Sequence, residues 1–451
     1  MRVHFIAIGG SAMHNLAIAL HKKGYKVTGS DDEIFEPSRS RLQKHGLLPD
    51  KQGWDTENIT TDIDAIILGM HARKDNPELQ KALESGLKVY SYPEYLYEQT
   101  KNKKRVVIGG SHGKTTITSM VMHTLKTMDI KFDYMVGAQL EGFDTMVNLN
   151  HDTEIAVFEG DEYLSSPIDL TPKFLWYKPQ IALLSGIAWD HINVFPTWEN
   201  YLEQFSKFAS TIEDKGTLVF YNGDPELVKI GEAQKKRLTT VPYSVLEYSV
   251  DGDKTLVSFG DKKYVLNIFG DHNLQNLNGA RLVCNELGIN ANDFLTAMQS
   301  FKGAAKRLQL LESTGNCNIY LDFAHSPSKL KATTQAVKAQ FKNRELVACM
   351  ELHTFSSLNK KFLPHYKSTM QAADRAIVYF NPEVLKHKQL PEISKEEVAK
   401  AFDHPNLIVF TDSDKLTEEL KKEEWKNQNL LIMTSGNFSG VDIKKLASEL
   451  I

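Results

Sequence analysis

A glycine loop between a predicted strand and a predicted helix constrains this 451-residue chain more than any other feature. The β-branched run 105–108 precedes the loop, and apolar residues recur at helical spacing through 117–128 after it. In that setting, backbone N–H groups and a helix N-terminus can hold phosphate oxygens. Lys114 would reach the β- and γ-phosphates, and the Thr115 hydroxyl would ligate Mg²⁺. The predicted phosphate-binding residues are Gly110, Ser111, His112, Gly113, Lys114, Thr115 and Thr116.

The loop departs in one position from the longer phosphate-binding pattern G-x-x-x-x-G-K-[ST]. Ile108 stands where that pattern has its first glycine, so the motif here is G-x-x-G-K-T. An ordinary glycine-rich turn with a solvated lysine is the alternative. The agreement of strand, loop and helix favours phosphate binding.

Bulk composition narrows the class of protein. The length suggests about three domains, and 41% hydrophobic with 24% charged residues is typical of soluble globular proteins. A net charge of -4 leaves no electrostatic footprint for nucleic acid, and no apolar run approaches the ~20 residues that span a membrane. Cys284, Cys317 and Cys349 are predicted to be small buried hydrophobes in a reducing compartment. We therefore expect a cytoplasmic, multidomain protein without nucleic-acid or membrane partners.

Residues 1–102 alternate predicted strands and helices, as in nucleotide-binding α/β domains. A strand over 3–8 leads into a tight turn, a helix is predicted over 15–23, and Asp31 follows the second strand. Asp31 lies at the usual distance for an acid that binds ribose, but the dinucleotide fingerprint is degenerate. NAD, another nucleotide and a purely structural turn remain open for this region. The turn contains Gly9, Gly10, Ser11 and Ala12.

Acidic residues follow two further buried strands. The run 155–158 leads into Glu159, Asp161 and Glu162, and the run 181–187 leads to Asp190 and His191. Parallel strands deliver their carboxyl ends to one edge of a sheet, so these side chains should meet the glycine loop. Acids there would repel one another and a triphosphate, which favours bound Mg²⁺. Solvated acidic loops and a capping histidine are the alternative.

The remaining sequence again alternates strands and helices from about residue 312. Asp322 and His325 follow a predicted strand end there. Upstream, Asn276 lies near the start of a predicted helix, where it either caps the helix or offers its amide to a purine. The spacing does not separate these two interpretations.

The ordered set of motifs resembles the Mur ligase family over essentially the whole chain. The motifs are Gly9 to Met13, Gly110 to Thr116, Glu159-x-Asp161-Glu162, Asp190-His191, His272-Asn273-x-x-Asn276, Lys306-Arg307-Leu308 and Asp322-Phe323-Ala324-His325. The resemblance implies three α/β domains. These are a Rossmann-like UDP-binding domain over 1–102, a central P-loop ATPase-like domain over 103–310 and a Rossmann-like donor-binding domain over 311–451.

The resemblance also implies a reaction and its site. Members join an amino acid or peptide to UDP-N-acetylmuramate, using ATP and Mg²⁺, and form ADP and an acyl phosphate on the way to peptidoglycan. Lys114, His191 and Arg307 would be catalytic, and Thr115, Glu159 and His191 would ligate Mg²⁺. Asn276 would contact adenine, Arg307 the γ-phosphate, and Asp322 with His325 the nucleotide. Gly9, Gly10, Ser11, Ala12 and Asp31 would line the UDP-sugar site.

Two departures concern the branch of the family. Many members carry a carbamylated lysine where this chain has Phe205, and Lys207 is the nearby lysine that would compensate. Two branches accept UDP-N-acetylmuramate without an attached peptide: one adds L-alanine, and a recycling branch adds L-Ala-γ-D-Glu-meso-diaminopimelate. The recycling branch is favoured by Glu162-Tyr163, the segment around His71, and the final glycine loop. An expected arginine is missing after Glu351, where His353 or Lys360 would replace it. The oligomeric state is left undetermined.

Overall fold

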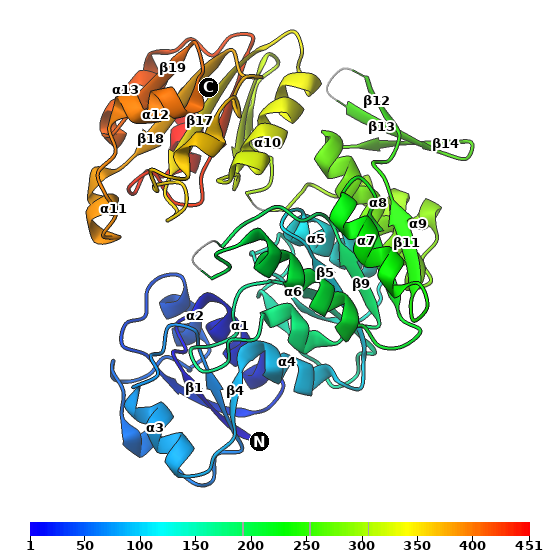
Figure 1. Cartoon of the computed structure of the whole chain (residues 1–451), viewed down its shortest axis with the longest axis vertical. Helices are drawn as coiled ribbons and strands as arrows, with labels where there is room; N and C mark the ends of the chain where they lie inside the picture. Colours follow the sequence, from blue (N-terminus) through cyan, green and yellow to red (C-terminus); the bar gives the residue numbers. More distant parts are fainter. Residues whose placement is uncertain (192–193, 252–253, 305) are drawn as a thin grey trace. The chain divides into compact units, whose positions relative to one another are not determined.

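The computed structural model describes residues 1–191, 194–251, 254–304 and 306–451 (Figure 1). Contacts divide the chain into two compact units. The first comprises 1–244 and 277–297, and the second comprises 245–276 and 298–451. A search of the described ranges finds no helix with both the length and the apolar character needed to cross a membrane.

The first unit begins with a four-stranded parallel sheet in the order β2-β1-β3-β4. Its strands are β1 (Arg2–Ile6), β2 (Lys26–Ser30), β3 (Ala65–Leu68) and β4 (Val89–Ser91), and its helices are α1 (Ser11–Lys22), α2 (Ser38–Lys44), α3 (Pro77–Glu84) and α4 (Tyr92–Thr100). The predicted bounds of β1 and α1 were wrong by two and four residues. Ala7 has a φ of 68°, and the Ala7 and Ile8 N–H groups both bond the Ser30 carbonyl, which ends the strand ladder early. The helix then begins at Ser11.

A seven-stranded sheet follows in the same unit, in the order β11-β10-β9-β5-β8-β6-β7. Only the β6–β7 edge pair is antiparallel among its strand pairs. The strands are β5 (Lys104–Gly109), β6 (Asp133–Met135), β7 (Val147–Asn148), β8 (Ile155–Glu159), β9 (Ile181–Leu184), β10 (Thr217–Tyr221) and β11 (Thr239–Tyr243). The helices are α5 (Lys114–Thr127), α6 (Trp198–Thr211), α7 (Pro225–Gln234), α9 (Ala291–Met298) and most of α8 (Asp271–Glu286), whose first residues belong to the second unit. β5 lies between β8 and β9, so the ends of these three strands share one edge.

The second unit contains a three-stranded antiparallel sheet and a six-stranded sheet in the order β15-β16-β20-β17-β18-β19. The strands are β12 (Tyr248–Asp251), β13 (Lys254–Phe259), β14 (Lys262–Leu266), β15 (Gln309–Ser313), β16 (Cys317–Asp322), β17 (Glu345–Leu352), β18 (Arg375–Phe380), β19 (Leu407–Phe410) and β20 (Gln428–Met433). The helices are α10 (Pro327–Gln340), α11 (Pro382–His387), α12 (Lys395–Phe402), α13 (Ser413–Lys422) and α14 (Ile443–Leu450). Only β15 runs antiparallel to its neighbour in the larger sheet.

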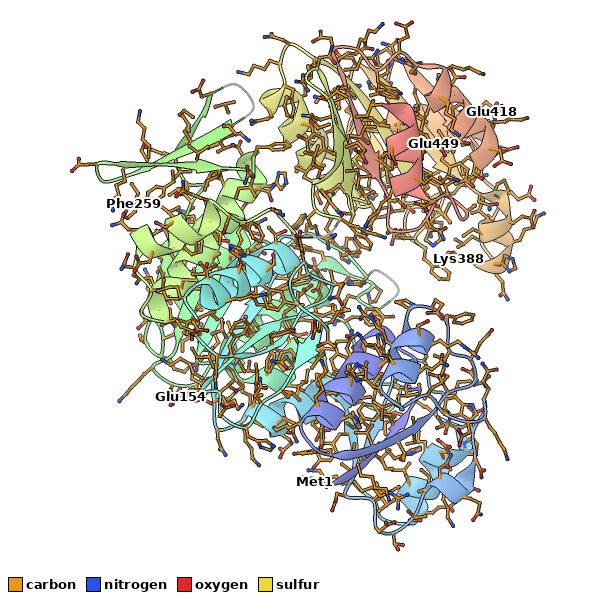
Figure 2. All side chains as sticks on the ribbon, turned by 180° about the vertical axis from the view of Figure 1, so that it is seen from behind. Met1, Glu154, Phe259, Lys388, Glu418 and Glu449 are labelled. Atoms are coloured by element: carbon orange, nitrogen blue, oxygen red, sulfur yellow. The ribbon has the colours of Figure 1, made fainter. Side chains whose placement is uncertain are left out.

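Central strands supply the cores of both units. Every residue of β3, β9 and β16 is buried, as expected for parallel strands covered on both faces. Charged side chains such as Glu154, Glu418 and Glu449 are exposed and project from the ribbon (Figure 2). The three cysteines are buried and form no disulfide, which confirms their predicted role as small core residues.

Candidate functional site

The glycine loop connects β5 directly to α5. Gly110 has a φ of 124°, and a Cβ at this position would clash with the Ser185 Oγ atom. Gly113 is left-handed and precedes the first residue of α5, where no side chain caps the helix. The helix therefore begins at Lys114, three residues before the predicted start, because Gly113 turns the chain straight into it. The uncapped N-terminus of α5 is an anion-binding position.

Lys114 is held inside the loop by two oxygen acceptors. Its Nζ atom donates to the Gly110 carbonyl and to Glu162 Oε2, each at 2.7 Å. The Lys114 and Glu162 side chains are only 15% and 1% exposed. Burial alone would lower the pKa of Lys114, but the carboxylates of Glu162 and Asp161 outweigh burial and hold that pKa above its usual value. The lysine is therefore a fixed positive charge at the helix N-terminus.

Thr115 and Glu159 form the part of the site that suits a divalent cation. Both are buried, and the Thr115 hydroxyl donates to Glu159 Oε1 at 3.0 Å. The second Glu159 oxygen accepts from the Gly137 N–H at 2.7 Å. Neighbouring ligands of octahedral Mg²⁺, each about 2.1 Å from the ion, lie about 3.0 Å apart. The oxygen type and the separation of these two side chains therefore fit Mg²⁺.

The other two acids of the segment after β8 are already neutralised by lysines. Asp161 pairs with Lys173 at 2.5 Å, as Glu162 pairs with Lys114. Burial would raise the pKa of Asp161, but the Lys173 and Lys114 ammonium groups outweigh it and hold that pKa below its usual value. Mutual repulsion of the acids therefore does not by itself require Mg²⁺, contrary to the expectation from sequence. Among the described residues, no three His, Cys, Asp or Glu side chains are grouped to hold a metal alone.

His191 approaches this cluster from the end of β9. Its Nε2 atom lies 3.9 Å from Glu162 Oε1, and its ring lies 5.1 Å from that of Tyr163. The backbone is left-handed there, with a φ of 53°, and the His191 N–H donates to the Asp190 side chain at 2.8 Å. The described residues thus bring the glycine loop, the acidic segment and the Asp-His segment together in the first unit.

The N-terminal glycine turn forms a second candidate binding site in the same unit. The Gly9 N–H donates to Asp31 Oδ2 at 2.6 Å, and Gly10 precedes α1 without a side-chain cap. Ser11 and Ala12 begin that helix, so their N–H groups can face an anion. Burial raises the pKa of Asp31 to about 6, and Asp32 adds to the effect, although the Gly9 N–H opposes it. His71 lies exposed in the turn after β3.

The predicted nucleotide residues of the second unit cluster around Asp322. The two Asp322 oxygens accept from the Leu308 and Ala324 N–H groups, both at 2.7 Å. Arg307 directly precedes Leu308, and its guanidinium lies 4.9 Å from the Phe323 ring. His325 Nδ1 bonds the Phe323 carbonyl at 2.9 Å. Asp322 therefore fixes the segment that carries Arg307. Asn276 belongs to the same unit and is buried on α8.

The structure distinguishes between the residues that the sequence suggested as replacements for the arginine and the modified lysine of the family. His353 Nδ1 lies 3.7 Å from Glu351 Oε1, beside the acid as expected. Lys360 instead pairs with Glu397 at 2.8 Å. Lys207 pairs with Glu203, and both side chains are more than half exposed, whereas Phe205 is fully buried. Lys207 thus faces solvent, and its contacts give no support to the prediction that it compensates for the family's modified lysine.

Lys173 and Tyr201 contact the acids of the segment after β8, although neither residue belongs to a motif found in the sequence. The Tyr201 hydroxyl donates to Glu162 Oε1 at 2.8 Å, and Lys173 pairs with Asp161. Both residues lie outside the Glu159-x-Asp161-Glu162 motif that contains the acids they contact. Ordinary helix amphipathicity explains a buried Tyr201, so no signal in the sequence distinguishes its contact with Glu162.

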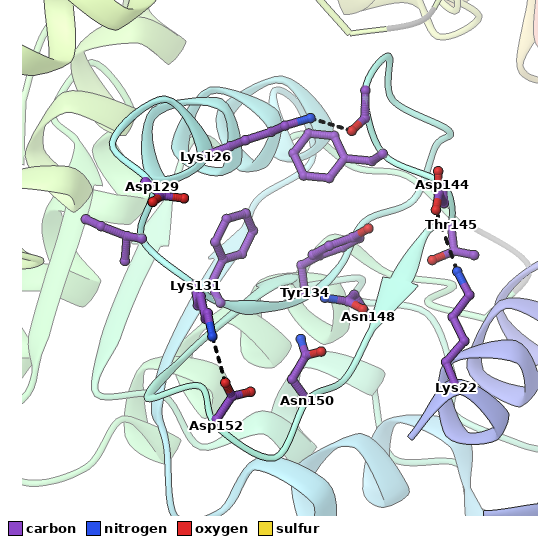
Figure 3. Close-up of a pocket in the computed structure, with 14 residues that line it drawn as sticks. Lys22, Lys126, Asp129, Lys131, Tyr134, Asp144, Thr145, Asn148, Asn150 and Asp152 are labelled. Atoms are coloured by element: carbon purple, nitrogen blue, oxygen red, sulfur yellow. Dashed lines mark hydrogen bonds and ion pairs between the residues drawn. The ribbon is translucent and has the colours of Figure 1, made fainter. Parts of the chain in front are cut away.

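A separate pocket of about 460 Å³ lies near the end of α5 (Figure 3). Its charged lining residues are Lys22, Lys126, Asp129, Lys131, Asp144 and Asp152. Figure 3 shows that each of its lysines has a partner: Lys131 forms an ion pair with Asp152, Lys22 forms one with Asp144, and Lys126 donates a hydrogen bond to a carbonyl. Equal numbers of positive and negative groups make it unsuitable for a triphosphate.

Three family models match the chain in order. They are "Mur ligase family, catalytic domain" over 2–104, "Mur ligase middle domain" over 108–284 and "Mur ligase, glutamate ligase domain" over 306–438. The chain belongs to the Mur ligase family. Members of this family are ATP-dependent amide ligases with a three-domain α/β fold.

Relatives of this Mur ligase carry two different names. A UDP-N-acetylmuramate–L-alanine ligase from Carboxydothermus hydrogenoformans is 26% identical, over 99% of this chain and 96% of the relative. A UDP-N-acetylmuramate–L-alanyl-gamma-D-glutamyl-meso-2,6-diaminoheptandioate ligase from Escherichia coli is also 26% identical, over 99% and 98%. The solved UDP-N-acetylmuramate–alanine ligase from Thermotoga maritima shares the fold, with a TM-score of 0.73, 20% identity, and coverage of 100% and 98%. Sequence identity therefore leaves the amino donor open.

Gly110→Ala tests the close approach of the loop to β9. The new methyl group would meet Ser185, adding an overpacking cost of about 1–3 kcal/mol to about 1–2 kcal/mol for the left-handed backbone. Gly24→Ala is the matched control, because Gly24 has a φ of 91° and a methyl group there would meet no atom within 4 Å. Denaturant unfolding should show a larger loss of stability for Gly110→Ala. Equal losses would mean that the Ser185 contact is unimportant.

Proposed function

We propose that this Mur ligase joins the carboxyl group of UDP-N-acetylmuramate to an amine at the expense of ATP. The observation that carries the proposal is the cluster at the start of α5, where Lys114 and the Thr115–Glu159 pair lie at an uncapped helix N-terminus. The glycine turn near Asp31 belongs to the same compact unit and offers a place for the sugar nucleotide.

The chemistry explains why the reaction needs positive charge at the site. A carboxylate is a poor electrophile because it is anionic and its oxide leaves badly. Transfer of the γ-phosphoryl group from ATP gives an acyl phosphate, which the amine attacks with loss of phosphate. Lys114 and the α5 N–H groups would bind and orient the phosphates and offset their charge. By resemblance to the family, Arg307, at the end of the central domain, would supply a second cation.

Mg²⁺ would be held by Thr115 and Glu159, with His191 near a second ion. A bound Mg²⁺ supplies charge neutralisation to the phosphates and the acyl oxygen. The remaining assignments follow the resemblance to the family: Asn276, Arg307, Asp322 and His325 for ATP, and Gly9, Gly10, Ser11, Ala12, Asp31 and His71 for the UDP-sugar. We place the reaction in the cytoplasm, with domain bounds of 1–102, 103–310 and 311–451.

For the amino donor we propose the tripeptide L-Ala-γ-D-Glu-meso-diaminopimelate, as in peptidoglycan recycling. The segments Glu162-Tyr163 and Asp322-Phe323-Ala324-His325 support this branch. His353 beside Glu351 gives the donor domain a group that can carry positive charge where an arginine is missing. L-Alanine is the alternative donor, supported by the name of the Carboxydothermus hydrogenoformans relative.

A competition experiment tests both levels of the proposal. The protein is incubated with UDP-N-acetylmuramate, ATP, Mg²⁺, L-alanine and the tripeptide, and the products are identified by mass. We expect the tripeptide adduct and one phosphate released per amide formed. An L-alanine adduct alone would overturn the donor assignment, and phosphate release without either amine would overturn the ligase assignment.

Lys114→Ala should remove catalysis while sparing sugar binding. Loss of the ammonium leaves the transferring phosphoryl group without its fixed cation, so amide formation should fall by more than tenfold, over about 1.4 kcal/mol. Lys126→Ala on the same helix is the control, since its Nζ atom contacts the Gly142 carbonyl in the separate pocket. Calorimetry should show nearly unchanged UDP-N-acetylmuramate affinity. Retention of more than a tenth of the activity would contradict the role of Lys114.

Asp31 should make UDP-N-acetylmuramate binding depend on pH. Its raised pKa of about 6 means that it is mostly protonated at pH 5 and ionised at pH 7. A ribose hydroxyl donates best to the ionised form, so affinity should rise about tenfold between these pH values and level off above them. Asp31→Asn should bind weakly without that pH dependence. The same slope in both proteins would exclude Asp31 as its source.

A further inference from the structure

A buried tyrosine outside every motif touches the centre of the candidate site. Tyr201 lies in α6 and is 0% exposed, and its neighbour Glu162 is 1% exposed. The Tyr201 hydroxyl lies 2.8 Å from Glu162 Oε1 and 2.8 Å from the Ser111 hydroxyl of the glycine loop. One phenol group thus contacts both the acidic segment and the phosphate loop.

The donors and acceptors in this chain of hydrogen bonds have one consistent direction. The Glu162 carboxylate only accepts, so Tyr201 gives it its single hydroxyl proton. Tyr201 can then only accept from Ser111, which therefore donates to it. Ser111 in turn accepts from the Ala188 N–H at 2.9 Å. The chain runs from the backbone near the Asp-His segment, through Ser111 and Tyr201, to Glu162.

Glu162 is the point where this chain of hydrogen bonds meets Lys114. Its second oxygen accepts from Lys114 Nζ at 2.7 Å, while its first faces His191 at 3.9 Å as well as Tyr201. A carboxylate buried this deeply needs hydrogen bonds to its remaining lone pairs, because the ion pair alone does not offset the cost of removing it from water. Burial, followed by the nearby Glu162 charge, raises the pKa of Tyr201 well above its usual value. The phenol therefore stays a neutral donor.

We propose that Tyr201 is a positioning residue for phosphoryl transfer, because its hydroxyl fixes Glu162 and thereby the ammonium of Lys114. This inference rests on the proposed function of the site. Tyr201 shares the stabilisation of the Glu162 charge, so Lys114 can exchange the carboxylate for a phosphate at lower cost. Without the hydroxyl, Glu162 depends more on Lys114 and competes more strongly with the nucleotide.

Tyr201→Phe removes the hydroxyl and keeps the ring that packs against Phe205 and Phe195. We expect Mg-ATP to bind at least threefold more weakly and kcat to fall at least tenfold. The KM for UDP-N-acetylmuramate should change less than twofold, because the glycine turn near Asp31 is untouched. Tyr221→Phe, on β10 of the seven-stranded sheet, is the matched control for loss of a phenol hydroxyl.

Thermal unfolding and nucleotide-binding stoichiometry give the folded fraction, to which kcat is normalised. Ser111→Ala, alone and combined with Tyr201→Phe, completes a double-mutant cycle. The fold-loss of kcat in the double variant should be smaller than the product of the two single fold-losses, because both substitutions interrupt the same chain of hydrogen bonds. Unchanged Mg-ATP affinity and normalised kcat in Tyr201→Phe would overturn the proposal, and so would fully multiplicative losses. Because Mg-ATP binding is measured without an amine, failure of the wild type to form an amide refutes the ligase assignment separately.

Discussion

The buried ion pair of Lys114 and Glu162 is the contact on which the candidate site depends. It joins the first residue of α5 to the segment after β8, and both charges are nearly removed from water. Such a pair is stable only when each member has further partners, which here are the Gly110 carbonyl and the Tyr201 hydroxyl. Charged groups with a shifted pKa, as Lys114 has, are concentrated at functional sites.

The parallel sheet explains why these residues meet at all. β5 lies between β8 and β9, so the glycine loop, the acidic segment and the Asp-His segment leave the sheet at one edge. Gly110 allows the loop to approach Ser185 more closely than any side chain would permit. The same geometry places Thr115 against Glu159 at a separation suited to Mg²⁺, although the other acids of the segment are neutralised by lysines.

Much of the fold and part of the site were predictable. The buried parallel strands were recognised because their apolar runs are continuous, whereas the β12–β14 sheet was not predicted, since its strands mix exposed and buried residues and have no continuous apolar run. Thr115 and Glu159 were predicted because each belongs to a motif with a chemical reason. Lys173 was not, because its contact with Asp161 depends on how the segment between them folds back.

The sequence alone determined the alternation of strands and helices in the larger sheets, the glycine loop between a strand and a helix, and the resemblance to a family, since these depend on local spacing. Only the tertiary structure decided which charges are paired. Lys207 is exposed to solvent, and His353 rather than Lys360 lies beside Glu351. Glu162 accepts hydrogen bonds from Lys114 and Tyr201. Ion pairs and hydrogen bonds act over a few ångströms between residues that are far apart in the chain, so the packing of the elements selects the partners.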